Sequence, residues 1–476
     1  MCEDAPTVPK PLSTPPTEHG LQRQMGLRDL VLAQVLCVVG SSWVGVGAVL
    51  GRAQALTWIT AMLLFYFPMA AVVICLNRIM PLEGGLYVWA HRSFGDLVGF
   101  LTAWNLWVYG FTITVAILYA IPSEIAYLLG PRAAWLPESH SASLAIVATI
   151  IVVVSLAAVR GLELGKWIHN FGGAAMITVF VALILLPLTL WFRHSSNLPV
   201  HPKDGLAIAL PPLNLHSAAL LGQMLVGALS GLEYIAIFAG ESRQPARNIT
   251  RSVWISSPII CLMFILGTSS VVTFAPRAID LIAPIPQTLR IALGHSGLGN
   301  VIAMAAILLL QIRLIGAASY LFSGVTRLPM AVGWDNLMPK WFTRLHPRWK
   351  TPVNSIVFTT VLMVAFLALT SFGVHAQEAY QVISNASMAH YELTYMVMFA
   401  IPLAGALAVR QSLPPWLKFV SIIGFLAALI SLLTSTYPFV DVVNPQAYAA
   451  KIGGTLLLSN IIALVFYKLR SRSARN

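Results

Sequence analysis

Apolar stretches of about twenty residues recur along this chain and limit its possible folds more than any other feature. Four of them are 30–50, 56–76, 144–159 and 255–273. Each comes close to the ~20 residues with which an α-helix crosses a hydrocarbon core of ~30 Å. Because backbone groups inside lipid must pair with one another, spans of this length are helices rather than barrel strands. We therefore predict an all-α integral membrane protein.

The composition supports a lipid environment and argues against a nucleic-acid partner. Of the 476 residues, 58% are hydrophobic and only 10% are charged, whereas soluble proteins carry about a quarter charged residues. The net charge is +12, but the basic residues are spread over short loops between apolar stretches. They form no basic face with interleaved aromatic residues, as a nucleic-acid surface would.

The apolar segments divide the chain into about twelve predicted transmembrane helices. The segment 286–325 is too long for one upright crossing, so we expect its first part to be an external, partly helical loop. The predicted helices lie near 29–51, 56–78, 97–127, 142–159, 168–192, 217–239, 252–275, 286–325, 353–371, 380–404, 415–436 and 447–468.

Basic residues orient this bundle. With the N-terminus inside, 21 lysines and arginines fall on the predicted cytoplasmic side and 7 on the other, and Arg313 lies within a span. The positive-inside rule then predicts a multi-pass protein of the cell (plasma or inner) membrane with both termini cytoplasmic. The polar segment 1–28 is rich in Pro, Ser and Thr and is predicted to be a disordered cytoplasmic tail. Residues 469–476 form a basic cytoplasmic tail.

Two clusters of small residues interrupt predicted helices. The first predicted helix contains Gly-Ser-Ser-Trp-Val-Gly-Val-Gly at 40–47, and the sixth contains Gly-Ala-Leu-Ser-Gly-Leu-Glu at 227–233. Glycine costs about 1 kcal/mol relative to alanine inside a helix. Such clusters permit close helix packing, or they mark discontinuous helices that bind substrate at mid-membrane. Paired interruptions in corresponding positions favour the second interpretation.

Several motifs resemble those of the amino acid–polyamine–organocation superfamily. They are Gly-Leu-Glu at 231–233 followed by Gly-Glu-Ser-Arg-Gln-Pro-Ala-Arg-Asn-Ile at 240–249, Pro-Leu-Glu-Gly-Gly-Leu-Tyr at 81–87, and Asp-Asn-Leu-Met-Pro-Lys at 335–340. Ser41, Gly45 and Gly47 are similar to the Gly-x-x-x-Gly-x-Gly of its first helix, with serine at the first glycine. The motifs fall in order between residues 29 and 354.

The resemblance implies a leucine-transporter-type fold. Its transport core, 29–404 here, would contain ten helices in two inverted repeats of five, with helices one and six broken around the substrate. Segment 405–468 would supply helices eleven and twelve. Members carry amino acids or polyamines, driven by protons or by a counter-substrate. Two positions depart from the family pattern: Met176 stands where many members have a lysine in helix five, and Gly227 or a neighbour replaces the aromatic gate of helix six.

Glu233 is the main candidate for proton coupling. Ionisable groups within spans are costly unless they are paired or hydrated, so each is a functional candidate. The resemblance implies an acid facing the transport pathway at this position, where it would take a proton or pair with a substrate ammonium. The alternative is a structural salt bridge with Arg313.

The remaining candidates are predicted from position and residue type. Arg313 would wall the pathway or pair with Glu233 or Glu392, and Glu124 is more typical of a hydrated rim. His390 is more typical of a packed or hydrogen-bonded side chain. The predicted substrate-binding residues are Ser41, Ser42, Gly45, Gly47, Tyr109, Ser230, Gly231 and Glu233.

Two substrate classes remain open. The amide end of a broken helix attracts a carboxylate and the carbonyl end attracts an ammonium, which suits amino acids. A polyamine would instead need acids such as Glu233 and Glu124. We predict no enzyme activity, because the histidines are scattered and neither HExxH nor GxSxG occurs; a membrane enzyme or a sensor is a remote alternative. No cofactor or metal is expected, and the protein would act as a monomer or homodimer.

Overall fold

The computed structural model places helices throughout the described part of the chain. The predicted tail 1–28 lies outside the described residues except for 25–28. The regular elements in the described ranges are helices, apart from an isolated β-bridge between Met25 and Ser242. The structure describes residues 25–80, 84–188, 202–205, 207–274, 278–334, 336–370, 376–404, 413–438, 442 and 444–473.

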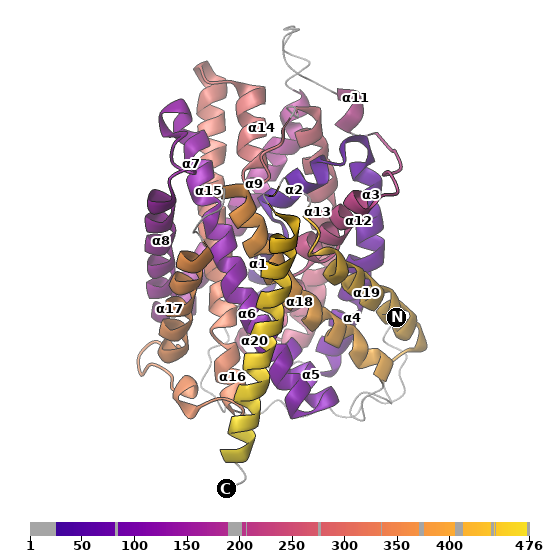
Figure 1. Ribbon diagram of the computed structural model, residues 1–476, viewed down its shortest axis with the longest axis vertical. Helices are drawn as coiled ribbons and strands as arrows, with labels where there is room; N and C mark the ends of the chain where they lie inside the picture. The colour runs from indigo at the N-terminus through magenta and orange to yellow at the C-terminus, as the bar shows by residue number, and fades with distance from the viewer. Residues whose placement is uncertain are drawn as a thin grey trace.

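The long helices stand side by side along the long axis of the molecule (Figure 1). Helices α7, α11 and α14 lie towards one end, and α5, α16 and the end of α20 lie towards the other. In the first half of the chain the helices are α1 Leu27–Val38, α2 Ser41–Ala48, α3 Gln54–Ala61, α4 Phe67–Ile79, α5 Leu86–Phe94, α6 Asp96–Tyr119, α7 Ile121–Leu129, α8 His140–Arg160 and α9 Leu162–Leu185.

The second half continues in the same manner. Its helices are α11 Pro202–Gly205, α12 Leu215–Gly222, α13 Pro245–Thr273, α14 Pro284–Leu293, α15 Gly297–Val325, α16 Leu328–Trp334, α17 Val353–Thr370, α18 Ala376–Ala404, α19 Pro415–Thr434 and α20 Pro445–Ser473. Short 3₁₀- and π-helical segments are η1 Gly51–Ala53, η2 Met62–Tyr66, η3 Gly130–Ala133, η4 Leu186–Leu188, η5 Gln223–Ala228, η6 Glu233–Glu241 and η7 Lys340–Thr343.

Helices occupy all twelve predicted ranges, and most can cross a membrane. By length and composition nine helical segments of the described chain qualify, or ten if α1 and α2 form one bent span. The two remaining ranges contain α17, whose apolar part is shorter, and α18, which carries Glu378, Asn385 and His390. A multi-pass helical membrane protein is thereby supported, and the number twelve and the inverted repeat stay predictions.

The segment 286–325 is not one continuous helix, and its first part is helical, as predicted. The external position of that part stays a prediction. The segment divides into α14 and α15, separated by a turn in which Gly294 has φ +75° and Gly297 has φ +61°. Only glycine adopts such angles without strain. The long apolar stretch is therefore a short helix packed on the bundle followed by one spanning helix.

Burial within the bundle places the sixth predicted helix at its centre. The segment Leu215–Ala239 is almost wholly buried, whereas Pro445–Arg470 of α20 is mostly exposed on the outside. Large apolar side chains such as Trp167 and Leu457 are likewise exposed, as expected for a surface that faces lipid. A site near residues 227–233 is thus enclosed by other helices.

Glycines let α9 and α15 approach closely. A Cβ atom on Gly316 would lie 3.1 Å from the Cα of Gly172 and 3.2 Å from the carbonyl oxygen of Ile168. Backbone contacts of this kind, made possible by small residues, hold helices together in lipid. Helices α9 and α15 are therefore packed in backbone contact.

We predict that Gly316→Leu lowers the thermal stability of the detergent-purified protein, because overpacking of this type costs about 1–3 kcal/mol. The measurement is the midpoint of thermal unfolding. Gly453→Leu is the matched control, since nothing lies within 4 Å of a Cβ atom at Gly453 on α20. Equal midpoints for the two variants would contradict the close contact.

Candidate functional site

The first predicted helix is broken at residues 39 and 40. Helix α1 ends at Val38, α2 begins at Ser41, and their axes differ by 45°. Val39 and Gly40 are extended, with ψ angles of 101° and 133°. The carbonyl end of α1 and the amide end of α2 therefore meet inside the bundle with backbone groups that lack intrahelical partners.

The second interruption lies in the sixth predicted helix. Helix α12 passes into the π-helix η5, residues 230–232 are not helical, and η6 follows as a 3₁₀-helix. Gly231 has φ +107°, a conformation that residues with a side chain rarely adopt. Both small-residue clusters therefore contain interruptions of a helix, as the sequence predicts. π-Helical segments are frequent at functional sites.

The two breaks face a common cavity of about 50 Å³, which has room for a few water molecules. Of the predicted substrate-binding residues, Ser41, Ser42, Tyr109 and Ser230 line it, while Gly45, Gly47, Gly231 and Glu233 do not in this conformation. Other lining residues are Leu36, Cys37, Val38, Gly40 and Trp43 from the two sides of the first break, Ile113, Ala116, Ile117 and Ala120 from α6 and the residue after it, Gly227 from η5, Ile282 from the segment before α14, Arg313, Leu314, Ala317 and Leu321 from α15, and Tyr380, Ser384 and Met388 from α18.

Gly45 and Gly47 serve close packing of α2. A Cβ atom on Gly45 would lie 2.9 Å from the ring of Pro284 at the start of α14. A Cβ atom on Gly47 would lie 2.8 Å from the indole nitrogen of Trp58. In this conformation these glycines fix the position of α2, and their substrate contact stays a prediction.

Glu233 is enclosed by tyrosine side chains from α18. Tyr391 donates a short hydrogen bond to Oε1 of Glu233, and Tyr395 donates one of 2.5 Å to Oε2. The backbone N–H of Gly231 donates to the Tyr395 hydroxyl at 2.9 Å. Tyr109, which lines the cavity, stacks on Tyr391 with ring centroids 3.6 Å apart. Two aromatic rings thus separate the buried carboxyl group from the cavity.

Arg313 does not form the predicted ion pair with Glu233 or Glu392. It donates to the carbonyl oxygen of Val39 at 2.6 Å and, at 3.4 Å, to the hydroxyl of Ser41. No carboxylate of the described chain lies within ion-pair distance of it. The carbonyl end of α1 carries partial negative charge, so the guanidinium group binds the helix break rather than an acid.

Glu124 and Glu392 are buried side chains outside the cavity lining. Gln311 donates to Glu124 at 2.9 Å, so Glu124 is fully buried rather than at a hydrated rim. Oε1 of Glu392 lies 2.5 Å from the hydroxyl of Ser431, which also lies 2.8 Å from the carbonyl oxygen of Gly222. The Ser431 hydroxyl thus joins Glu392 of α18 to the backbone of α12.

His390 is a packed histidine, as its position suggested. It is buried, and its Nδ1 lies 2.8 Å from the carbonyl oxygen of Ala386 on the same helix. Among the described residues no group of three or more His, Cys, Asp or Glu side chains is placed to hold a metal ion.

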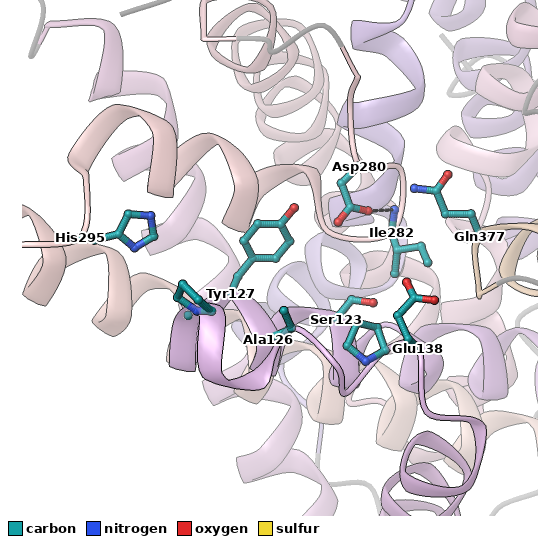
Figure 2. Close-up of a pocket in the computed structure, with 12 residues that line it drawn as sticks. Ser123, Ala126, Tyr127, Glu138, Asp280, Ile282, His295 and Gln377 are labelled. Carbon is teal, nitrogen blue, oxygen red and sulfur yellow. Dashed lines mark hydrogen bonds between the residues drawn. The ribbon is translucent and has the colours of Figure 1, made fainter.

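A larger pocket of about 390 Å³ lies at the end of the molecule that carries α7 and α14. Figure 2 shows Ser123, Glu138, Asp280 and Gln377 around Ile282, whose backbone N–H donates to Asp280 at 2.9 Å. Ile282 lines this pocket and the central cavity. The pocket and the central cavity therefore share Ile282 as a common wall residue.

The N-terminal segment makes several contacts with other parts of the bundle. The backbone N–H of Arg243 donates to the carbonyl oxygen of Met25 at 2.9 Å. Asp29 forms an ion pair of 2.9 Å with Lys166 and accepts a hydrogen bond of 2.7 Å from Asn170. These contacts join the start of α1 to α9 and to the segment after η6.

Comparison with known proteins identifies the family. The amino acid permease family model matches residues 30–466, which is most of the chain. The chain belongs to the amino acid permease family. This confirms the resemblance inferred from the motifs at 231–249 and 335–340.

Relatives of this permease include an uncharacterized transporter and transporters whose names state a substrate. An uncharacterized transporter of Legionella pneumophila is 26% identical over 402 residues, covering 83% of this chain and 82% of that protein. The probable agmatine/putrescine antiporter AguD of Lactococcus lactis is 24% identical over 355 residues, 73% of each chain. The lysine-specific permease LysP of Escherichia coli is 25% identical over 376 residues, 74% of this chain and 73% of LysP.

The missing aromatic residue of helix six has a structural explanation in this permease. A Cβ atom on Gly227 would lie 2.7 Å from the Trp43 ring, and one on Gly40 would lie 2.4 Å from it. Trp43 from the first break therefore fills the space beside the sixth helix. Met176, which the resemblance aligned with a lysine of helix five, is fully buried in α9.

Sequence reasoning missed four aromatic residues of the site. Trp43 and Tyr380 line the cavity, Tyr380 donates to Ser42 at 2.9 Å, and Tyr391 and Tyr395 hold Glu233. The spacing of the last two was an available signal, because residues i and i+4 share one face of a helix. Nothing in the sequence shows that this face meets the sixth helix.

We predict that Lys166→Ala makes Cys37 react faster with a thiol reagent, because loss of the ion pair with Asp29 favours conformations open at that end. A half-buried pair worth about 1 kcal/mol corresponds to roughly a fivefold change in population. The rate is measured in a variant lacking Cys2, Cys75 and Cys261, so that Cys37 of the cavity is the remaining thiol. Lys418→Ala, at an exposed lysine of α19, is the control. An unchanged rate in Lys166→Ala would argue against a closing role for the pair.

Proposed function

We propose that this permease is a secondary active transporter that moves amino acids across the cell membrane. The observation that carries the proposal is the meeting of two helix breaks at one buried cavity. There the amide end of α2 is suited to a substrate carboxylate, and the carbonyl groups around the breaks are suited to an ammonium group. Ser41, Ser42, Tyr109 and Ser230 would contact the substrate directly.

Glu233 is proposed as the residue that couples transport to protons. Its two oxygens accept hydrogen bonds from Tyr391 and Tyr395. A proton on the carboxyl group would turn one oxygen into an O–H donor and a weaker acceptor, which would weaken the hydrogen bond from one of these hydroxyls. Tyr391 stacks on Tyr109 of the cavity wall. A change at Glu233 would therefore alter the surface that the substrate contacts. The cycle would be proton-coupled uptake or exchange.

The access cycle follows from the two ends of the pathway. In this proposal the pocket beyond Ile282 faces the outside, and the Met25–Ser242 bridge and the Asp29–Lys166 pair close the cytoplasmic side. Movement of Ile282 would admit the substrate to the cavity. Opening of the Met25–Ser242 bridge and the Asp29–Lys166 pair would then release the substrate to the cytoplasm. Both termini would be cytoplasmic, with the protein acting as a monomer or homodimer.

A polyamine or organic cation is the second candidate substrate. AguD is named as a probable agmatine/putrescine antiporter, and this chain is similar to it. However, Glu124 is bound by Gln311 and Glu233 by tyrosines, and neither lines the cavity. This observation favours amino acids. An enzyme or a sensor remains the remote alternative.

We predict that Glu233→Gln abolishes the pH dependence of transport while the protein stays folded and membrane-inserted. A carboxyl group that must bind a proton in each cycle makes the rate fall as the medium becomes too alkaline to protonate it, and glutamine cannot titrate. Uptake by proteoliposomes is measured across pH. Glu392→Gln is the matched control, because Glu392 is equally buried but does not lie behind the cavity wall. A normal pH profile in Glu233→Gln would remove Glu233 from the coupling role.

The substrate class is tested by thermal stabilisation of the purified protein with amino acids, polyamines and amines. A ligand that binds only the folded state adds about 2.7 kcal/mol of stability at a hundredfold excess over Kd. We expect amino acids to raise the unfolding midpoint. Stabilisation by polyamines alone would favour the second candidate.

A further inference from the structure

Arg313 combines three properties of a residue that binds a carboxylate group. It lines the central cavity, its side chain is only 3% exposed, and its Nε atom is buried without a hydrogen-bond partner. We propose that Arg313 binds the carboxylate of the substrate, and that the substrate is a small amino acid with an uncharged, apolar side chain. This inference rests on the proposed function and narrows it.

The guanidinium group has unused donors at the cavity. Arginine carries five N–H donors in a planar fork that matches a carboxylate. Two nitrogens bind the first helix break, Nη2 to Val39 at 2.6 Å and Nη1 to Ser41 at 3.4 Å. The second contact is long, and Nε makes none. A carboxylate entering the cavity would complete this donor set.

The start of α2 adds positive charge at the same point. Ser41 is the first residue of α2, so the amide groups that lack intrahelical partners lie next to the guanidinium group. The amide end of a helix carries about half a positive charge. The guanidinium group and the amide end of α2 therefore both produce positive potential at this point, which suits an anionic group.

A purely structural role does not account for this residue. A neutral donor could cap the carbonyl oxygen of Val39, whereas burying an unpaired cation costs several kcal/mol. Glu124 of α7 attracts Arg313 from beyond ion-pair distance, but its direct hydrogen-bond partner is Gln311. Charged residues retained within spans commonly mark substrate pathways. No carboxylate of the described chain contacts the guanidinium group directly, so this contact is assigned to the substrate.

The rest of the cavity sets the side-chain preference. Ile113, Ala116 and Ile117 of α6 form one wall, and Leu314 and Ala317 of α15 form another. Arg313 is the one Lys, Arg, Asp or Glu side chain among the described lining residues. A cationic side chain or a polyamine would therefore contact no carboxylate there. The small volume of the cavity favours a short apolar side chain.

The test compares a small neutral amino acid, L-alanine, with its carboxamide, with ethylamine, which lacks the carboxylate, and with L-lysine and putrescine. Binding to the full-length purified protein is read by the unfolding midpoint and by protection of Cys37, which lines the cavity. The wild type is expected to bind L-alanine and to discriminate against the other four. Arg313→Gln should lose roughly 10- to 100-fold in affinity for L-alanine, the range of a charge-assisted hydrogen bond, and should no longer distinguish L-alanine from its amide.

Two further variants separate recognition from folding. Arg313→Lys keeps the charge but loses the fork, so it should retain partial preference for the acid over the amide. Arg290→Gln is the matched control, because Arg290 is also buried but binds Tyr127, Leu128 and Asn300 outside the cavity. It is expected to lose stability and to keep the preference. A structural role for Arg313 would lower stability without changing that preference.

The outcomes distinguish the inference from the proposed function. If L-alanine binds the wild type and Arg313→Gln keeps both affinity and preference, the role of Arg313 is overturned and amino acid transport stands. If only L-lysine binds, the apolar side-chain preference is overturned. If only putrescine or ethylamine binds, the inference and the amino acid assignment both fail. A wild type that binds none of the five overturns the inference as well, because the cavity then takes no small carboxylate.

Discussion

The structure depends on how backbone groups are satisfied where two helices break inside the bundle. Non-helical backbone is tolerated at membrane depth only where protein surrounds it or where it lines a cavity. Arg313 of α15 supplies a donor to Val39 at the first break, and the Tyr395 hydroxyl of α18 accepts from Gly231 at the second. Each break is thus completed by a neighbouring intact helix.

This requirement explains the polar side chains of otherwise apolar helices. Helix α18 brings Tyr391 and Tyr395 to the second break and Tyr380 to Ser42 beside the first. A helix that must serve both breaks carries several polar groups on its inner face. Its low apolar content therefore follows from the contacts that it makes at the site.

The cavity wall connects the breaks to the buried carboxyl group. Tyr109 faces the cavity and stacks on Tyr391, which binds Glu233. The cavity wall and the buried carboxyl group are therefore joined by direct contacts between these three side chains. Trp43 closes the opposite wall above Gly227. The site is a single packed unit, so substrate and proton need not touch each other to be coupled in the proposed cycle.

The sequence by itself determined the helical membrane architecture, the positions of the helices along the chain and the two helix breaks. Apolar length, glycine φ preferences and the cost of glycine in helices are local properties, which explains why 40–47 and 227–233 were correctly identified. The partners of Arg313, Glu124 and Glu233 were decided only by the tertiary structure. Contacts between α15 and the first break, or between α18 and η6, join residues more than 150 positions apart, and helix periodicity carries no information about which faces meet.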